Sequence, residues 1–347
     1  MKALYLTVAL LFLTVSAAWG QSDTIKKLAN YSGPAADYEK MLHEGAKKEG
    51  KVVWYTSLGG KSWKTIRSEF AKKYPDVKIE VYRAGSKDIS SKVFAEAKAG
   101  KHLADATETT PGIMQLFREA KIITPYTSPE HKRWPDEHQI KAKSGGVWWV
   151  TDRESFIGLG YNTKKLSKEE APKSFDDLLN PALKGKVVMS ILSTGDRMIG
   201  TMLKVKGREY VEKLKAQQFK LAKISGTATR DLIISGEFLA SPSVFRNHAL
   251  VKINEGAPLG WNPLDEVPTN AGGSSLFANA PHPHAALLLI NFVLTEGQKI
   301  LQKFYYGMAW RDYPFKRVYP ERGLSAAQYN RKLKEWNKLL RSIGRRG

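Results

Sequence analysis

The sequence contains no cysteine. That absence excludes disulfide bonds, cysteine-ligated zinc, iron–sulfur centres and cysteine nucleophiles, and also the cysteine-linked anchor of lipoproteins. Acidic residues are scarce beside basic ones, 34 against 55, so the formal charge is +21 over 347 residues. Hydrophobic residues make up 42% of the chain and charged residues 26%, a composition that excludes a disordered, collagen-like or coiled-coil protein. The length suits two domains of roughly 150 residues each.

Long apolar runs are missing except near the N-terminus, where residues 3–15 form one after a single lysine. The small residues Ala18 and Gly20 follow with the spacing of a cleavage site, which predicts a signal peptide over residues 1–20. A membrane anchor is the alternative, but the run is shorter than the roughly 20 residues that cross a bilayer. We therefore expect a periplasmic protein, secreted and not lipid-anchored, that begins near Gln21.

Strand and helix patterns alternate after residue 50. The β-branched and aromatic run at 51–57 indicates a buried strand. The elements expected next are a helix at 63–74 with apolar residues three and four apart, a strand at 77–81, a helix at 89–97 and a strand at 103–107. This order is typical of a parallel sheet with right-handed crossovers.

The alternation returns in the second half of the chain. The patterns indicate strands at 147–150, 156–161 and 186–191, helices at 196–205, 208–217 and 227–234, a loop-rich return around Pro263 and Pro268, and a helix from Pro283 to Leu294. The prediction is an α/β protein of two lobes, each a mainly parallel sheet flanked by helices. Lobe 1 comprises residues 21–105 plus 263–347, and residues 106–262 form the crossover and lobe 2.

Catalytic and cofactor motifs are incomplete. Gly60-Lys61-Ser62 lacks the earlier glycine of a phosphate loop, and Gly158-Leu-Gly160 lacks the third glycine of a dinucleotide fingerprint. No nucleophile elbow or His-Glu-x-x-His occurs. His282 and His284 flank a proline at a helix start without a third ligand at a known spacing, which favours capping over metal binding. We expect no enzyme, no cofactor and no metal.

Three strand ends run into small polar residues and then a helix. They are Thr56-Ser57, Ser193-Thr194-Gly195 before the helix with Arg197, and Ser225-Gly226-Thr227 before the helix with Arg230. The positive end of a helix and its free N–H groups suit an anion, and open α/β sheets bind ligands beyond the carboxyl ends of their strands. Ordinary capping is the alternative at each position.

Several stretches, in this order, match a known family. They are Val52–Ser57, Tyr82–Ser86, Ala95–Lys101 with Ala104-Asp105, Tyr161–Lys164, Ala171–Leu179, Ala280–Pro283 and Glu296–Leu301. The chain resembles the type 2 periplasmic solute-binding proteins of ABC transporters, extracellular solute-binding family 1, particularly the branch that includes ferric-iron binders. The match extends over residues 45–310.

The resemblance implies a two-lobed receptor hinged by crossover strands. It would close on one small-molecule ligand in an interlobe cleft, as a monomer, and deliver it to an ABC permease in the inner membrane. Carried over by position, Thr56 and Ser57 contact the ligand, and Ser193, Thr194 and Gly195 hold an anion at a helix start. Arg153 lies near the family's cleft arginine.

The chain departs from the iron binders, which place adjacent tyrosines after the Gly-Glu that is here Gly236-Glu237. Residues 240–245 contain no tyrosine, and Fe(III) favours phenolate or carboxylate oxygens. Tyr305-Tyr306 lie in a helical region where packing is the better interpretation. A ferric-iron-binding protein remains an alternative, as does a secreted enzyme on this scaffold.

The residues favour an anionic ligand instead. Arg153, Arg197 and Arg230, with hydroxyl-bearing loops, suit a carboxylate, phosphate or phosphonate, because a guanidinium binds such groups with two hydrogen bonds. Phe245 and Trp261 would supply an apolar wall. The hypothesis is a partly organic anion.

The tail at residues 331–346 holds seven Lys or Arg against one Glu. Leu333, Trp336, Leu340 and Ile343 lie on one helical stripe. Membrane or nucleic-acid contact is one interpretation, and a surface helix packed by its stripe is the one we favour. The lysines spread along the chain without a base-reading motif, so we expect no nucleic-acid partner.

Overall fold

The chain forms two units. The computed structural model describes residues 23–28 and 31–346, and the expected signal peptide lies outside them. Unit 1 consists of the described residues up to 152 together with 272–300, and unit 2 of residues 153–271 and 301–347. The expected α/β architecture is confirmed. In the described part of the chain, no helix has the length and apolar character needed to span a bilayer.

The chain passes between the units three times: within β6 (Val147–Asn162), within β11 (Val267–Phe277) and within α10 (Glu296–Lys303). Three stretches differ from the expected lobes, since residues 106–152 belong to unit 1, and residues 301–347 and 263–271 belong to unit 2. The reason for the first is pairing, because β3 (Ala106–Thr109) lies between β1 and β11 in the sheet of unit 1. The reason for the second is that the C-terminal helix packs on α6 of unit 2.

The sheet of unit 1 is built on parallel pairing of β1 with both β2 and β3. The end of β11 joins antiparallel to β3, β4 pairs with β11, and β5 pairs with the start of β6. The bounds of these strands are β1 (Lys51–Thr56), β2 (Lys78–Arg83), β4 (Ile123–Thr124) and β5 (Gln139–Lys141). The expected strand–helix alternation over residues 51–107 is therefore confirmed.

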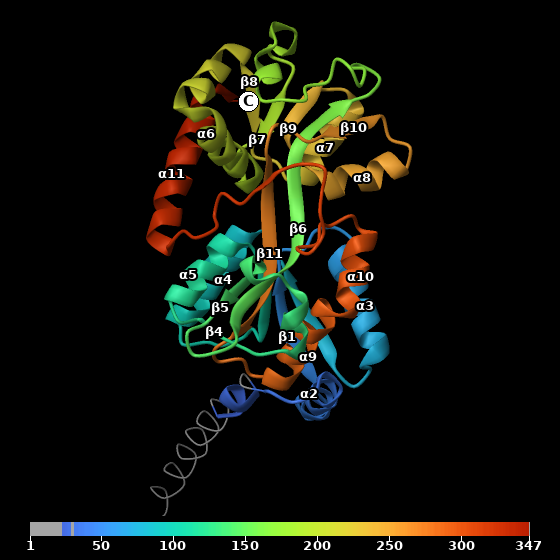
Figure 1. Ribbon diagram of the computed structural model, residues 1–347, viewed down its shortest axis with the longest axis vertical. Coiled ribbons are helices and arrows are strands. Elements are labelled where there is room, and N and C mark those ends of the chain that lie inside the picture. Colours follow the sequence, from blue (N-terminus) through green and yellow to red (C-terminus); the bar gives the residue numbers. More distant parts are fainter. Residues whose placement is uncertain (1–22, 29–30, 347) are drawn as a thin grey trace, which may run out of the picture. The chain divides into compact units, whose positions relative to one another are not determined.

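Helices cover this sheet on both faces. Figure 1 shows α4 and α5 on one side of the strands and α3 and α9 on the other, and α2 packs along α9. The bounds are α2 (Ala35–Glu49), α3 (Ser62–Lys73), α4 (Ser86–Lys98), α5 (Pro111–Glu119) and α9 (Pro283–Leu294). Short 3₁₀ helices η1 (Pro129–Arg133) and η2 (Asp136–His138) follow α5. Trp54, Phe70, Phe117 and Phe292 are fully buried between the layers.

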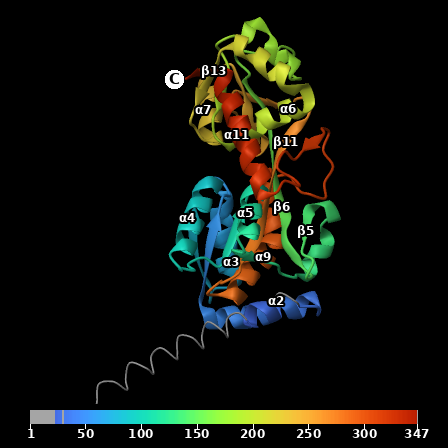
Figure 2. The ribbon, with the colours of Figure 1, turned by 90° about the vertical axis from the view of Figure 1, so that its left-hand side faces the viewer.

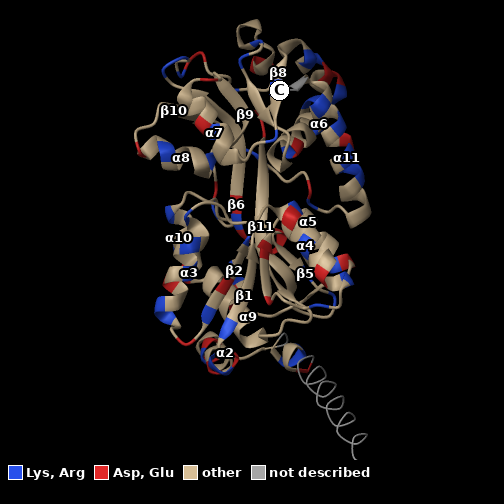
Figure 3. Cartoon of the chain, turned by 180° about the vertical axis from the view of Figure 1, so that it is seen from behind, with Lys and Arg blue, Asp and Glu red and all other residues tan. Residues whose placement is uncertain are grey.

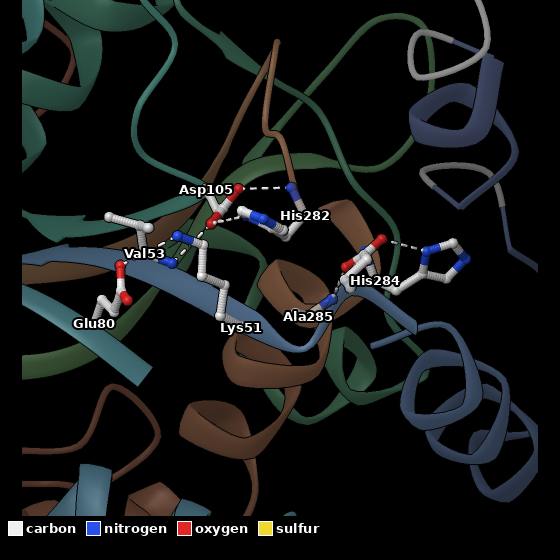
Figure 4. A network of polar contacts seen from close by, with 8 residues as sticks. Lys51, Val53, Glu80, Asp105, His282, His284 and Ala285 are labelled. Atoms are coloured by element: carbon white, nitrogen blue, oxygen red, sulfur yellow. Dashed lines mark hydrogen bonds and ion pairs between the residues drawn. The ribbon is translucent and has the colours of Figure 1, made fainter. Parts of the chain in front are cut away.

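Two carboxylates cap the start of α9 (Figure 4). Asp105 accepts hydrogen bonds from the backbone N–H of His282 at 2.7 Å and from its Nδ1 at 2.9 Å. Glu49 accepts from Nδ1 of His284 at 2.7 Å and from the N–H of Ala285 at 2.8 Å. The capping groups are therefore the carboxylates of Asp105 and Glu49, and the two histidines donate to them rather than capping the helix themselves. These hydrogen bonds hold the start of α9, whose residues are buried.

Unit 2 contains a parallel sheet in the order β13-β8-β7, while β9 and β10 pair antiparallel with β6. Its strands are β7 (Val188–Ser190), β8 (Phe219–Ala222), β9 (Ala240–Phe245), β10 (Leu259–Asn262), β12 (Arg317–Val318) and β13 (Gly344–Arg346). Its helices are α6 (Ser193–Lys213), α7 (Gly226–Ser235), α8 (Arg246–Asn254) and α11 (Ala326–Ser342), with 3₁₀ helices η3 (Asp176–Leu179), η4 (Pro181–Leu183) and η5 (Leu214–Gln217).

Helix α6 bends where the sequence predicts two helices. Gly207 has φ 80° and ψ 178° within the α6 range. A positive φ of this size is accessible to glycine at little cost. The break therefore falls between the expected helices at 196–205 and 208–217.

Helix α11 packs lengthwise on α6 (Figure 2). Trp336, Leu340 and Ile343 are buried in the core of unit 2. A Cβ built on Gly200 would lie 2.7 Å from the Trp336 ring, so the α6 glycine makes room for the indole. The packed stripe expected for the tail is confirmed.

Strand β11 is the main element that the sequence analysis does not predict. The stretch expected as a loop-rich return contains this fully buried strand. Its residues are largely Gly, Ser, Thr and Asn, without an alternating apolar pattern. A Cβ on Gly273 would lie 2.5 Å from the carbonyl oxygen of Val150, so close backbone approach requires glycine there.

Candidate functional site

The carboxyl ends of three parallel strands meet at one edge of the unit 1 sheet. Thr56 pairs in register with Arg83 of β2 and with Glu108 of β3. Helices α3, α4 and α5 follow these strands, and none of their N-cap residues, Lys61, Gly85 and Thr110, makes a side-chain capping bond. Three helices thus begin at the edge of the sheet where open α/β sheets bind ligands.

Thr56 and Ser57 lie at this edge as expected, but they hold a carboxylate that the sequence analysis missed. Oε2 of Glu108 accepts from the Thr56 hydroxyl at 3.0 Å and from the N–H and hydroxyl of Ser57, each at 3.2 Å. Glu108 and Thr56 are both fully buried. No local motif marks Glu108, because its partners lie about fifty residues earlier.

The start of α6 carries the second predicted loop. Ser193, Thr194 and Gly195 form its first turn, and a Cβ on Gly195 would lie 1.9 Å from the carbonyl oxygen of Ser190. Asp196 in the same turn is buried and accepts from Asn337 at 2.9 Å. The negative charge of Asp196 offsets the positive end of the helix, so this terminus is a poorer anion site than the sequence suggested.

Arg197 and Arg230 are both bound to carboxylates. Nε of Arg197 lies 2.7 Å from Oε1 of Glu321, and both side chains are almost completely buried. Nε and Nη2 of Arg230 donate to Oδ1 of Asp231 at 2.9 and 2.7 Å. Ser225 caps α7 by accepting from the N–H of Ala228 at 3.2 Å. Capping and ion pairing therefore account for these side chains within unit 2.

Arg153 is buried in unit 2, only 3% exposed. Its Nη1 donates to the Ser155 hydroxyl at 3.3 Å and to the carbonyl of Asn270 at 3.5 Å, and its guanidinium lies 5.8 Å from the centre of the Tyr306 ring. Tyr305 accepts a hydrogen bond from Asn254. The two adjacent tyrosines thus contact protein groups of unit 2.

Next to Arg153, Glu154 forms a buried network. It accepts from Arg317 at 2.8 Å and from the Tyr319 hydroxyl at 2.5 Å. Burial raises the pKa of Glu154, while Tyr319 and Arg317 oppose that rise. The charge of Arg317 is therefore also used inside the protein.

Arg246 differs from these arginines, and the sequence analysis missed it. It is the first residue of α8, directly after β9, and is half-buried. Within the residues that the structure describes, neither Arg246 nor the nearby Arg311 has a hydrogen bond or ion pair through its side chain. Burial lowers the pKa of Arg246, and the positive charge of Arg311 lowers it further, against the opposing effect of Tyr313.

Phe245 and Trp261, which were expected to form an apolar wall, contact different groups. Phe245 precedes Arg246 and makes an edge contact with the His248 ring at a centroid distance of 5.2 Å. Trp261 donates from Nε1 to the carbonyl of Val244 at 3.1 Å and contacts Phe315 edge-on. Phe245 also packs against the hydrophobic core of unit 2, so both rings have packing partners within the protein.

Metal ligands do not gather in the part of the chain that the structure describes. No group of three or more His, Cys, Asp or Glu side chains is placed to hold a metal ion there.

Comparison with known proteins agrees with this architecture. Residues 65–307 match the model of the family described as bacterial extracellular solute-binding protein. An uncharacterized protein of Haemophilus influenzae is 27% identical over 273 residues, which is 74% of this chain and 77% of that protein.

Several solved structures have a similar fold, including AfuA and HitA. The binding protein AfuA from Actinobacillus pleuropneumoniae, with exogenous fructose-6-phosphate bound, has a TM-score of 0.72 at 23% identity, covering 84% of this chain and 99% of that one. Iron-bound HitA from Pseudomonas aeruginosa has a TM-score of 0.66 at 19% identity, covering 85% and 99%. At these identities the likeness establishes the fold alone.

Proposed function

Because the chain belongs to the bacterial extracellular solute-binding proteins, we propose that it captures a small organic anion in the periplasm and delivers it to an ABC permease. The observation that carries the anion assignment is Arg246. Its guanidinium is half-buried without a carboxylate of the described chain to pair with, and burial, more than the charge of Arg311, lowers its pKa. A bound anion would supply the missing negative charge.

The arginine proposed to bind the ligand is Arg246, which differs from the arginines expected from the sequence. Arg197 and Arg230 are already bound to carboxylates, so a ligand anion would compete with Glu321 or Asp231 for them. No carboxylate of the described residues pairs with Arg246 in this way.

Neighbouring proteins with this fold carry a sugar phosphate or iron, which defines the probes. Fructose 6-phosphate, citrate and ferric ion would each be titrated calorimetrically into the protein. We expect a phosphate or carboxylate anion to bind and ferric ion alone not to bind. Native mass spectrometry of freshly purified protein tests the same point without choosing a probe.

The variant Arg246→Gln should weaken binding of that anion by about tenfold to a hundredfold, since charged hydrogen bonds contribute about 1.5–3 kcal/mol. The control is Arg67→Gln, which removes one exposed arginine of α3 in unit 1. Equal affinity of wild type and Arg246→Gln would refute the assigned contact. Tight binding of ferric ion alone would instead favour the iron-binding alternative. Recovery of the ligand chemically unchanged distinguishes a receptor from an enzyme.

A further inference from the structure

Helix α11 carries a line of cations along its outer face. Arg331, Lys334, Lys338 and Arg341 are spaced by three, four and three residues, which places them on one side of a helix. All four are exposed, and Figure 3 shows basic residues along this helix. At about 1.5 Å per residue the four charges extend over about 15 Å. We call these four residues the cationic stripe.

The charges of the cationic stripe are not used inside the protein. Within the described residues none of the four forms an ion pair, and Arg341 donates only to the neutral side chain of Asn337, at 2.7 Å. Glu335 is the acidic residue of α11, and it already pairs with Arg208 at 2.9 Å and with Lys332 at 3.2 Å. The stripe therefore keeps its full positive charge toward solvent.

The opposite face of α11 fixes the stripe in place. Tyr329, Trp336 and Leu340 are buried in unit 2. Ser325 and Gln328 close a capping box at the start of the helix. The four cations are consequently presented on a rigid element rather than on a loose tail, although they lie beyond the stretch matched by the family model, which ends at residue 307.

We propose that the cationic stripe docks the protein on an anionic phospholipid surface. Charge complementarity selects a polyanionic partner, and each Lys or Arg near an anionic membrane strengthens binding by about fivefold. A nucleic acid fits less well, because single-stranded binding uses aromatic rings for stacking and the rings of Tyr329 and Trp336 are buried. Adsorption would hold the receptor at the membrane surface in which the proposed permease lies.

The test compares two variants that lose the same charge. One replaces the stripe, R331Q/K334Q/K338Q/R341Q, and the other replaces four exposed lysines elsewhere, K40Q/K48Q/K98Q/K168Q. Both reduce the formal charge of the full sequence from +21 to +17, since four positive charges are removed. Each protein, as the cell exports and processes it, is sedimented with vesicles of phosphatidylcholine alone or of phosphatidylcholine and phosphatidylglycerol in equal parts.

Wild type should bind the phosphatidylglycerol vesicles, and raised ionic strength should release it. The stripe variant should bind more than about tenfold less and the control within about threefold of wild type. Equal losses in both variants would mean that overall charge acts rather than the stripe, and would overturn the proposal. So would absence of wild-type binding, or stripe-dependent binding of soluble heparin without binding of vesicles.

Discussion

His131 should make the stability of unit 1 depend on pH. The imidazole is 8% exposed and lies in η1, where its ring meets Tyr126 edge-on at a centroid distance of 5.1 Å. Its Nδ1 accepts from the backbone N–H of Ser128 at 3.4 Å, and its Nε2 is buried without a partner in the described chain. A proton added to this ring would have no acceptor.

Burial lowers the pKa of His131 from 6.5 to about 4. The folded state therefore binds the proton more weakly than the unfolded state does. Above the unfolded pKa of 6.5 both states are neutral and stability is unaffected. As the pH falls below that value the unfolded chain takes up the proton first, and stability is lost down to the folded pKa near 4. Between about pH 7 and about pH 5 this loss amounts to about 2 kcal/mol.

The variant His131→Phe keeps a ring against Tyr126 and removes the titrating group. Urea unfolding followed at several pH values should show a stability loss on acidification that is smaller by about 2 kcal/mol than in wild type. His102→Gln, at an exposed histidine, is the control and should keep the wild-type dependence. If His131→Phe lost stability with acid as steeply as wild type, the reasoning from burial would be wrong.

Three further predictions concern the stability of unit 2. Removing one partner of a buried ion pair leaves the other charge uncompensated, so Arg197→Met should lower the free energy of unfolding by about 3–5 kcal/mol. The double variant Arg197→Met/Glu321→Leu should lose less stability than Arg197→Met alone, as measured by urea unfolding. Gly195→Ala should destabilise by about 1–3 kcal/mol or more through its backbone clash, whereas Gly85→Ala should be tolerated, as thermal melts would show. Ser325→Ala should cost about 1 kcal/mol by removing the α11 cap, measured by chemical denaturation.

The elements that the sequence predicts well are those with strong local patterns. The strand at 51–57 and the helix after it combine β-branched or aromatic runs with regular apolar spacing, and the structure has both. The kink at Gly207 also follows from a local signal. Strand β11 could not be predicted in this way, because its burial arises from packing of small polar residues between other elements.

The site was harder to predict because charge pairing is a tertiary property. The arginine in the pattern at Ser193–Arg197 looked free, but its partner Glu321 lies far along the chain. Glu108 was missed for the same reason. Arg246 follows a strand that contains Pro242, and proline argues against a strand in sequence, so its place at a strand end was not apparent.

The pairing of β13 with β8 has a consequence for synthesis and stability. The last residues of the chain complete a sheet whose other strands are made more than a hundred residues earlier, and unit 1 likewise waits for α9. Residues made late in synthesis therefore complete packing that residues made much earlier begin. A change that weakens the pairing of β13 with β8 should accordingly destabilise unit 2.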